Sequence, residues 1–412
     1  MHRLYADIPI NEVTVSQTIN GPACVIWAMY LAMAKERGID WNLLGGTLQN
    51  DILKEFHSQN EFIYPPEASV KLVIDTIEYA TKYTKRWNSV SISGYHIREA
   101  GSTATQELAF TLRDGMEYVE ACMKRGLDVD AFAPRLSFFF NSHNEFFEEI
   151  CKLRAARRIW ATVMRDRYGA KNNRSLLMRT HVQTAGCSLT EQQPLNNIVR
   201  VAYQAMAGVL GGCQSLHTDS MDETLGLPTE TAVRVALRTQ QILAHETGVH
   251  RTVDPLAGSY FVESLTNQME SDANNIINEI DSLGGVIQGI HKGYFRRSIA
   301  EASYRFGQEM EAGDRTIVGV NAYTDGNNDA QVDLLQIPHS VEITQCERLE
   351  NFLKTRDEDN VARALEFIRT AGRNDENIMD SLVDGALARC TLGEMVQAMA
   401  DVFGRYSGGP EW

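Results

Sequence analysis

Over the first 250 residues, short runs rich in β-branched, hydroxyl-bearing and aromatic residues alternate with longer amphipathic stretches. The longer stretches place apolar residues at helical spacing, so the alternation predicts strands joined by helices in a parallel α/β fold. The predicted strands are Val13–Ile19, Gly45–Gln49, Ser89–His96, Arg135–Phe140, Leu176–Thr184 and Gln214–Ser220. The predicted helices are Val70–Trp87, Thr105–Arg125, Glu145–Tyr168, Asn196–Leu210 and Thr229–His245.

After about residue 250 the pattern changes to helices joined by loops. The run DGNNDA at Asp325–Ala330 is typical of a surface loop. We therefore expect two regions, a partial (β/α) barrel over residues 1–250 and a helical linker or subunit-contact region over residues 251–412. The helices predicted in the second region are Leu265–Leu283, Phe295–Gly313 and Val361–Ala371.

Polar side chains occupy alternate positions of several predicted strands, which places them on one face of each strand. Buried parallel strands are usually apolar on both faces, and a buried polar group without a partner costs about 1–3 kcal/mol. The pattern favours a lumen that holds a long hydrophilic ligand; the alternative is that these faces meet water at sheet edges. The positions are Thr14, Ser16, Thr18 and Asn20, then Ser89, Ser91 and Ser93, then Arg179, His181 and Gln183, then Ser215, His217 and Asp219.

Six strand-and-helix units are two fewer than a closed (β/α) barrel contains. The count fits either an open doubly wound sheet or a barrel that lacks its first two units. Because the polar strand faces favour a filled lumen, we predict an α/β protein built on a (β/α)8 TIM-type barrel without its first two strands. A helical C-terminal region is expected to follow.

The composition, with 43% hydrophobic and 23% charged residues, is that of a globular protein. No stretch has the pattern of a membrane span, a signal peptide or a transit peptide, so we expect a cytoplasmic protein. Seven scattered cysteines without a C-x-x-C pair disfavour disulfides and structural zinc, and no metal site is predicted. A net charge of −15 disfavours nucleic acid and membranes as partners, so an anionic ligand requires a local basic patch.

Seven sequence runs, taken in order, resemble one known family. Those in the first region are GTLQNDILKEF (46–56), SISGYHIREAG (91–101), APRLSFFF (133–140), RTHVQTAG (179–186) and QSLHTDSMDETLGLPT (214–229). Those in the second are VDPLAGSY (253–260) and IVGVN (317–321). Together they resemble the methylmalonyl-CoA mutase family, whose barrel holds coenzyme A along its axis. The resemblance also implies that this chain is N-terminally incomplete, without two strands and an N-terminal arm.

The reaction that the resemblance implies is a radical rearrangement of an acyl-CoA carbon skeleton with adenosylcobalamin as cofactor. The cobalt–carbon bond breaks homolytically, a hydrogen atom leaves the substrate, the thioester group migrates and a hydrogen atom returns. The cofactor supplies the radical. The protein must hold the thioester, exclude water and donate a hydrogen bond to the carbonyl oxygen.

Matched positions assign roles to individual residues. His96, Gln49 and Tyr95 match residues that contact the thioester and corrin, and we predict that they are catalytic; taken alone, they could be a core histidine, a strand cap and an aromatic wall. The predicted substrate-binding residues are Thr47, His181, Gln183, Arg179 and Arg135. The predicted cofactor-binding residues are Ser215, Asp219 and Glu223, where Asp219 departs from the family's asparagine. Arg98 and Arg135 match positions near the substrate or coenzyme, and each could equally be a structural ion-pair partner.

Gln59 matches the position where mutases of malonyl-type substrates carry an arginine that binds the free carboxylate. Glutamine cannot replace that bidentate charged contact, and burial of a carboxylate against a neutral amide is costly. The resemblance therefore favours the isobutyryl-CoA mutase-like branch, with isobutyryl-CoA or 2-hydroxyisobutyryl-CoA as substrate. A solvated helix residue without a function is the alternative interpretation of Gln59.

The Asp-x-His-x-x-Gly signature of the family's cobalamin-binding domain does not occur in this sequence. The resemblance therefore implies a separate small cobalamin-binding subunit, a dimer of large subunits within a heterotetramer, and a G-protein chaperone. Two other hypotheses remain. The chain is either a methylmalonyl-CoA mutase that uses another cation in place of Gln59, or a truncated assembly protein without activity, because unpaired strand edges invite pairing with another chain.

Overall fold

The computed structural model describes residues 1–324 and 335–408. Within these residues, seven short strands run parallel in two sheets. The predicted loop Asp325–Ala330 lies outside the described residues. The first sheet contains, in order, β1 (Thr14–Gln17), β2 (Gly45–Leu48) and β3 (Arg86–Asn88). The second contains β4 (Val90–Ser93), β5 (Leu136–Ser142), β6 (Arg179–Thr184) and β7 (Ser215–His217).

β3 and β4 are two halves of one barrel strand, separated by Ser89. The backbone N–H of Ser91 in β4 donates to the carbonyl of Gln49, just after β2, at 2.8 Å. β2 therefore borders β3 at its start and β4 at its end. The strands occupy six neighbouring positions in sequence order, which confirms the predicted α/β fold with a TIM-type barrel region and a helical C-terminal part.

The predicted helix Val70–Trp87 is too long, because Trp87 lies in β3 and helix α2 (Pro66–Tyr83) ends before it. Trp87 pairs in register with Gly46 and is almost fully buried. A Cβ atom on Gly46 would lie 2.2 Å from the Val15 carbonyl oxygen and 2.7 Å from the Trp87 ring, so a side chain at this position does not fit beside Trp87. Apolar spacing alone does not distinguish one more helical turn from a buried strand.

The predicted strand Ser89–His96 is also too long. β4 ends at Ser93, and Tyr95 and His96 begin the short helix α3 (Tyr95–Glu99). The turn is tight at Gly94, where a Cβ atom would lie 2.3 Å from the Thr111 hydroxyl. Tyr95 and His96 therefore follow helical rather than alternating geometry, and their directions do not continue the polar face of the strand.

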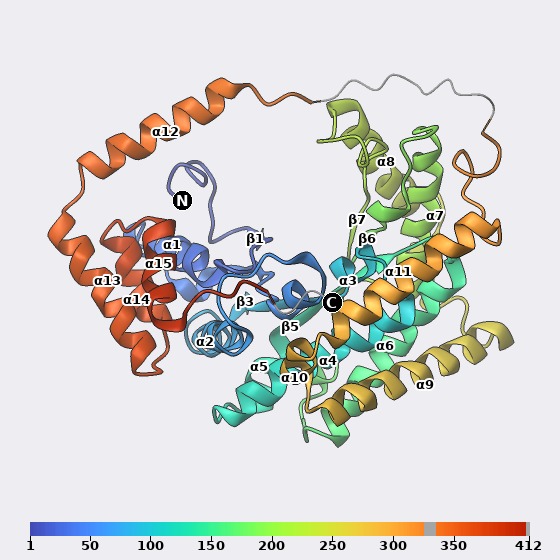
Figure 1. Cartoon of the computed structure of the whole chain (residues 1–412), viewed down its shortest axis with the longest axis horizontal. Coiled ribbons are helices and arrows are strands. Elements are labelled where there is room, and N and C mark those ends of the chain that lie inside the picture. Colours follow the sequence, from blue (N-terminus) through green and yellow to red (C-terminus); the bar gives the residue numbers. More distant parts are fainter. Residues whose placement is uncertain (325–334, 409–412) are drawn as a thin grey trace.

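Helices follow the strands and cover the outer side of the barrel region (Figure 1). Helix α1 (Ala23–Glu36) is missing from the predictions because it is apolar on nearly every side and has no polar stripe to reveal its period. The other helices of this region agree with the predictions to within a few residues. They are α2, α4 (Ala104–Lys124), α6 (Phe146–Asp166), α7 (Asn196–Gly211) and α8 (Glu230–His245). The short helix α5 (Val129–Phe132) was not predicted.

The C-terminal helices form two packing groups. The first group packs on α4 and α6, and it comprises α9 (Tyr260–Leu283), α10 (Val286–His291) and α11 (Tyr294–Ala312). The second packs on α1, and it comprises α13 (Glu358–Arg373), α14 (Met379–Leu387) and α15 (Leu392–Phe403). Between them, α12 (His339–Lys354) buries no residue and stands apart from the other helices in Figure 1. Of these helices, α9, α11 and α13 were expected from the apolar spacing.

Two hydrophobic cores hold the barrel strands against their helices. One core joins β4, β5 and β6 to α4, α6 and α9, with Trp160 and Phe138 among its buried side chains. The other joins β2 to α1, α13, α14 and α15, around Trp27 and Trp87, whose ring centroids are 5.9 Å apart. The apolar faces of the strands thus point outward and pack against the helices, and the opposite faces are free to line a lumen.

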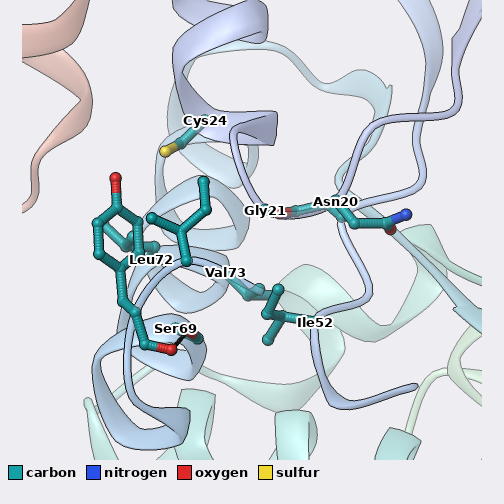
Figure 2. A pocket seen from close by; sticks show the side chains of 10 residues that line it. Asn20, Gly21, Cys24, Ile52, Ser69, Leu72 and Val73 are labelled. Carbon is teal, nitrogen blue, oxygen red and sulfur yellow. Dashed lines mark hydrogen bonds between the residues drawn. The ribbon is translucent and has the colours of Figure 1, made fainter. Parts of the chain in front are cut away.

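A small cavity between the start of α1 and α2 is separate from that lumen (Figure 2). It is lined largely by apolar side chains such as Leu72, Val73 and Ile52, and the Asn20 side chain points away from it. Ile52 and Val73 belong to the first core and Leu72 to the second, so this cavity is a packing feature at the boundary between the two cores. Among the described helices, none combines the length and the apolar character that a bilayer crossing requires.

Candidate active site in the barrel lumen

A cavity of about 490 Å³ lies along the inner face of the barrel strands, between β1 and β7. Polar strand faces line it, which confirms the lumen expected from the alternating pattern. The predicted site residues on its wall are Thr47, Gln49, Arg179, His181, Gln183 and Ser215. Further wall residues, not predicted as site residues, are Ser16, Asn88, Ser91, Ser137, Phe139 and His217.

The strand register places lumen side chains in hydrogen-bonded layers. Thr47 in β2 pairs with Ser16 in β1 and with Asn88 in β3. The Asn88 amide nitrogen donates to the Thr47 hydroxyl at 3.1 Å, and Arg179 donates to the Asn88 amide oxygen at 3.4 Å. Asn88 therefore links Thr47 and Arg179, two residues that sequence reasoning assigned to the substrate separately.

Four arginines gather at the amino ends of the strands, at one mouth of the lumen. Arg86 begins β3, Arg135 immediately precedes β5, Arg174 lies in the turn before β6, and Arg179 begins β6. Burial lowers the pKa of Arg135, and the positive charges of the other three arginines lower it further. In a chain with a net charge of −15, this mouth is a local basic patch that an anion can neutralise.

The Gln49 side chain presents a hydrogen-bond donor to the lumen. The Asn20 amide oxygen accepts from the backbone N–H of Asp51 at 3.2 Å, which directs the Asn20 nitrogen to the Gln49 oxygen at 2.7 Å. With its oxygen engaged, Gln49 offers its side-chain N–H groups to a ligand. This polarity suits the carbonyl oxygen of a thioester, and the thioester is the group that the resemblance assigns to Gln49.

Tyr95 and His96 do not belong to the wall of the cavity, but both contact Phe139, which does. The Tyr95 ring stacks on Phe139 with centroids 4.9 Å apart, and the His96 ring meets its edge at 5.7 Å. Burial, together with the nearby Lys54 ammonium, holds the pKa of His96 well below its ordinary value. His96 is therefore a neutral imidazole, and its Nδ1 atom is buried without a hydrogen-bond partner.

At the other mouth of the lumen, Asp219 is the centre of a hydrogen-bond network. Its buried carboxylate accepts from the Gln183 amide nitrogen and from the Thr184 hydroxyl, both at 2.8 Å. The same Gln183 nitrogen donates to the Tyr95 hydroxyl at 2.9 Å. Nε2 of His217 lies 3.4 Å from the Asp219 carboxylate, which raises the pKa of His217.

Two further carboxyl groups, those of Glu99 and Glu223, lie close enough to Tyr95 for their charges to act on its hydroxyl. Burial raises the pKa of Glu99 to about 7, and burial together with the charge of Asp219 raises the pKa of Glu223. Glu99 accepts from the Asn141 amide at 2.6 Å and from the Cys187 backbone at 2.7 Å. Sequence reasoning missed Glu99, although it lies one helical turn after Tyr95, within the matched run SGYHIREAG.

The remaining predicted residues occupy different places. Ser215, assigned to the cofactor, lies in mid-lumen, where its hydroxyl is 2.6 Å from Nδ1 of His181. Burial lowers the pKa of His181 to about 4, so this imidazole is neutral. Gln59 is exposed on the π-helical turn Glu55–Gln59, does not line the cavity, and accepts a 2.9 Å hydrogen bond from the ammonium of Lys54.

Comparison with known proteins bears on this arrangement. The family model described as methylmalonyl-CoA mutase matches residues 1–405. The chain belongs to the methylmalonyl-CoA mutase family. It is 47% identical to the methylmalonyl-CoA mutase of Rhizobium meliloti (strain 1021) over an alignment of 413 positions, which covers 100% of this chain and 58% of that protein.

The chain is also similar to relatives that carry two different names. The human mitochondrial methylmalonyl-CoA mutase is 44% identical, over 98% of this chain and 54% of that protein. The 2-hydroxyisobutanoyl-CoA mutase large subunit of Aquincola tertiaricarbonis is 42% identical, over 100% of this chain and 73% of that protein. The chain thus spans little more than half the length of these methylmalonyl-CoA mutases, and identity alone does not assign it to the isobutyryl-CoA branch.

Proposed function

We propose that this chain carries the substrate lumen of an adenosylcobalamin-dependent acyl-CoA mutase, an isomerase that rearranges the carbon skeleton of a branched acyl-CoA without a free carboxylate. The proposed reactions are isobutyryl-CoA to n-butyryl-CoA, or 2-hydroxyisobutyryl-CoA to 3-hydroxybutyryl-CoA. The observation that carries the proposal is a polar lumen with an arginine cluster at one mouth and a hydrogen-bonded carboxyl cluster at the other.

Coenzyme A fits the polarity of this lumen. Its phosphate groups would meet Arg135 and Arg179, which are surrounded by like charges and gain most from an anion. Its pantetheine arm carries amides that suit the hydroxyl and amide groups of Thr47 and Asn88. The thioester would then lie near the carboxyl ends of the strands, where Gln49 offers its donor.

In this proposal, Gln49 and His96 hold the migrating thioester by donation to its carbonyl oxygen. The pKa of His96 is held well below its ordinary value, so the ring is neutral and carries one N–H. That N–H donates a hydrogen bond and stays on the ring, because a neutral imidazole is a very weak acid. His96 can therefore polarise the carbonyl throughout the rearrangement without transfer of a proton to it. The Phe139 ring lines the cavity beside these groups and the Tyr95 ring stacks on it, and this apolar pair helps to exclude water from reactive intermediates.

The cluster of Asp219, Glu223 and Glu99 fits the hydroxyl groups of an adenosyl ribose, since carboxylates accept hydrogen bonds from them. When bound, adenosylcobalamin supplies the substrate-activating radical by homolysis of its cobalt–carbon bond. The chain's own residues would orient the adenosyl group, Glu223 and Glu99 directly and the fully buried Asp219 through the side chains that donate to it. The cobalt ligand would come from another domain or subunit.

The substrate class is the finer part of the proposal. Lys54 is fully buried, and its charge is already neutralised by Glu55. Gln59, which is hydrogen-bonded to Lys54, is itself neutral. These residues therefore offer no net positive charge to a substrate carboxylate. This supports a substrate without that carboxylate, as does the likeness to the 2-hydroxyisobutanoyl-CoA mutase large subunit. The second candidate substrate is methylmalonyl-CoA, favoured by the 47% identity to the Rhizobium meliloti enzyme.

The proposed partners follow from the same likeness. A small cobalamin-binding subunit would dock over the carboxyl ends of the strands, within a cytoplasmic heterotetramer built on a dimer of large subunits and served by a G-protein chaperone. The region 251–412, whose helix α12 buries no residue, would provide subunit contacts. A non-catalytic assembly role is the third candidate, because β1 and β7 each have one strand neighbour among the described residues.

One experiment separates these candidates. The chain is co-expressed with a candidate small cobalamin-binding subunit, supplied with adenosylcobalamin, and assayed with isobutyryl-CoA, 2-hydroxyisobutyryl-CoA and methylmalonyl-CoA. Turnover of either of the first two is the expected result. Efficient turnover of methylmalonyl-CoA would contradict the substrate assignment, and a folded complex that binds coenzyme A without turnover of any substrate would favour the assembly role.

A further inference from the structure

Donor and acceptor counting around Asp219 determines which way the neighbouring amide of Gln183 faces. A carboxylate can only accept hydrogen bonds, whereas an amide has a donor end and an acceptor end. The Gln183 nitrogen donates one N–H to Asp219 at 2.8 Å and the other to the Tyr95 hydroxyl at 2.9 Å. The reverse orientation would set the Gln183 oxygen against the carboxylate, so the nitrogen must face Asp219.

The Gln183 oxygen is consequently the end that is left for a ligand. Gln183 lines the lumen cavity, and no described residue donates to its side-chain oxygen. The Tyr95 hydroxyl accepts from Gln183 and so keeps its own proton available for donation. An acceptor and a donor therefore lie side by side at this mouth of the lumen.

We propose that Asp219 is a positioning residue, which turns the Gln183 side-chain oxygen toward the lumen so that it accepts a hydrogen bond from an N–H or O–H group of the bound ligand. Thr184 supports this arrangement, because its hydroxyl donates to the second carboxylate oxygen of Asp219 while it accepts from the Asp219 backbone N–H at 2.9 Å. The inference rests on the proposed acyl-CoA lumen. It adds that this mouth of the lumen selects a ligand with a hydrogen-bond donor at that position.

An asparagine at position 219 reverses this polarity. Its oxygen would take the place that accepts from Thr184, which turns its nitrogen toward Gln183. The Gln183 side chain would then rotate to present its oxygen to that nitrogen and its own N–H groups to the lumen. Asp219→Asn thus exchanges an acceptor for a donor at the ligand with almost no change in volume.

Two probes distinguish the ligand groups that could supply the donor. Pantetheine offers amide N–H groups, and adenosine offers ribose O–H groups. Titration calorimetry measures the affinities for pantetheine and for adenosine of four proteins. These are the wild-type chain, Asp219→Asn, Gln183→Leu and the double variant. We expect Asp219→Asn to lower the affinity for the probe that donates to Gln183 by about tenfold, which corresponds to the loss of one hydrogen bond. Glu230→Gln, an exposed charge removal on α8, is the control and should leave both affinities unchanged.

The double variant separates positioning from a general structural effect. If Asp219 acts through Gln183, Asp219→Asn should cause no further loss in the Gln183→Leu background. A spectroscopic signature accompanies this result: the Gln183 side-chain NH2 signals, assigned by their disappearance in Gln183→Leu, should shift in Asp219→Asn as their charged acceptor is removed. Thermal unfolding followed by circular dichroism checks that each variant is folded.

The outcomes are distinct. Unchanged affinity for both probes in Asp219→Asn, or additive losses in the double variant, would overturn the role of Asp219 and leave the proposed function in place. A wild-type chain that binds neither probe would contradict the acyl-CoA lumen itself. If Asp219→Asn does not fold, Gln183→Leu alone decides, since unchanged binding of both probes by that variant also refutes the inference.

Discussion

The ammonium group of Lys54 donates a 2.9 Å hydrogen bond to the side-chain oxygen of Gln59, five residues later on a π-helical turn. The same ammonium pairs with Glu55, and both charged side chains are fully buried. The cation nearest to Gln59 is therefore already neutralised, and Gln59 is held with its N–H groups free. π-helical turns are rare and often occur at functional sites, which agrees with the role proposed for this position.

Gln59→Arg should shift substrate preference. The guanidinium can bind a free carboxylate in a bidentate manner, so we expect kcat/KM for methylmalonyl-CoA to rise relative to that for isobutyryl-CoA or 2-hydroxyisobutyryl-CoA by at least about tenfold. Kinetics of the reconstituted enzyme with each substrate measures this ratio. Gln59→Leu is the matched control, since it removes the amide without a charge. A wild-type enzyme that already prefers methylmalonyl-CoA would disprove the proposed role of Gln59.

Arg179→Gln should weaken coenzyme A binding by about tenfold or more, because one charge-assisted hydrogen bond to a phosphate contributes about 1.5–3 kcal/mol. Calorimetric titration at low and high salt gives both the affinity and its salt dependence, which should also decrease. Arg165→Gln removes a charge from an exposed pair with Asp166 and serves as the control. Equal affinity of wild type and Arg179→Gln would argue against a phosphate site at the arginine cluster.

The lumen residues were predictable where the alternation of polar and apolar positions within a single strand is enough to place them. Arg179, His181 and Gln183 alternate along one strand, so a period of two is enough to place them on a common face. Asn88 and the arginine cluster were not predictable in this way. They depend on which strands are neighbours and on their register, and Asn88 follows Trp87, whose segment has the apolar spacing of a helix.

The directions of Tyr95 and His96 show the limit of motif matching. The run SGYH identifies these residues, but the chain leaves β4 after Ser93 and enters a helical turn that the motif does not reveal. As a result Phe139 from β5, and not His96, forms the cavity wall at this height. A residue on another strand decides which side chain lines the cavity, and only the assembled fold contains that information.

Acid should destabilise the chain through His57, which lies fully buried 3.4 Å from Asp114 and stacked on Phe295. Burial, with a smaller contribution from the charge of Arg296, lowers the pKa of His57 from 6.5 to about 3. Between these values the unfolded chain binds more protons than the folded chain, so stability rises with pH and is lost as pH falls below 6.5. The loss from this group by pH 5 is about 2 kcal/mol.

Urea unfolding at pH 7.5, 6 and 5 measures this dependence. His57→Gln should show a flatter pH profile between pH 6.5 and 5, because the residue that must stay neutral in the folded state is gone. The exposed His245→Gln on α8 should retain the wild-type profile. An unchanged slope in His57→Gln would show that other groups control the acid sensitivity.

Lys152→Met should destabilise the fold by about 3–5 kcal/mol, because it leaves buried carboxylates without their cation. The Lys152 ammonium donates to Glu107 at 2.6 Å and to the Asn141 carbonyl at 2.9 Å, and it also pairs with Glu149. The Asn141 side chain in turn donates to Glu99, so this cluster supports the carboxyl mouth of the lumen from beneath. Urea unfolding gives the change in the free energy of unfolding.

Two variants make the Lys152 prediction specific. The exposed Lys124→Met on α4 loses the same charge and should change stability by less than about 0.5 kcal/mol. Lys152→Met combined with Glu107→Gln and Glu149→Gln removes the buried charges together and should recover much of the lost stability. Equal stability of Lys152→Met and the wild type would mean that the cluster does not depend on its ion pairs.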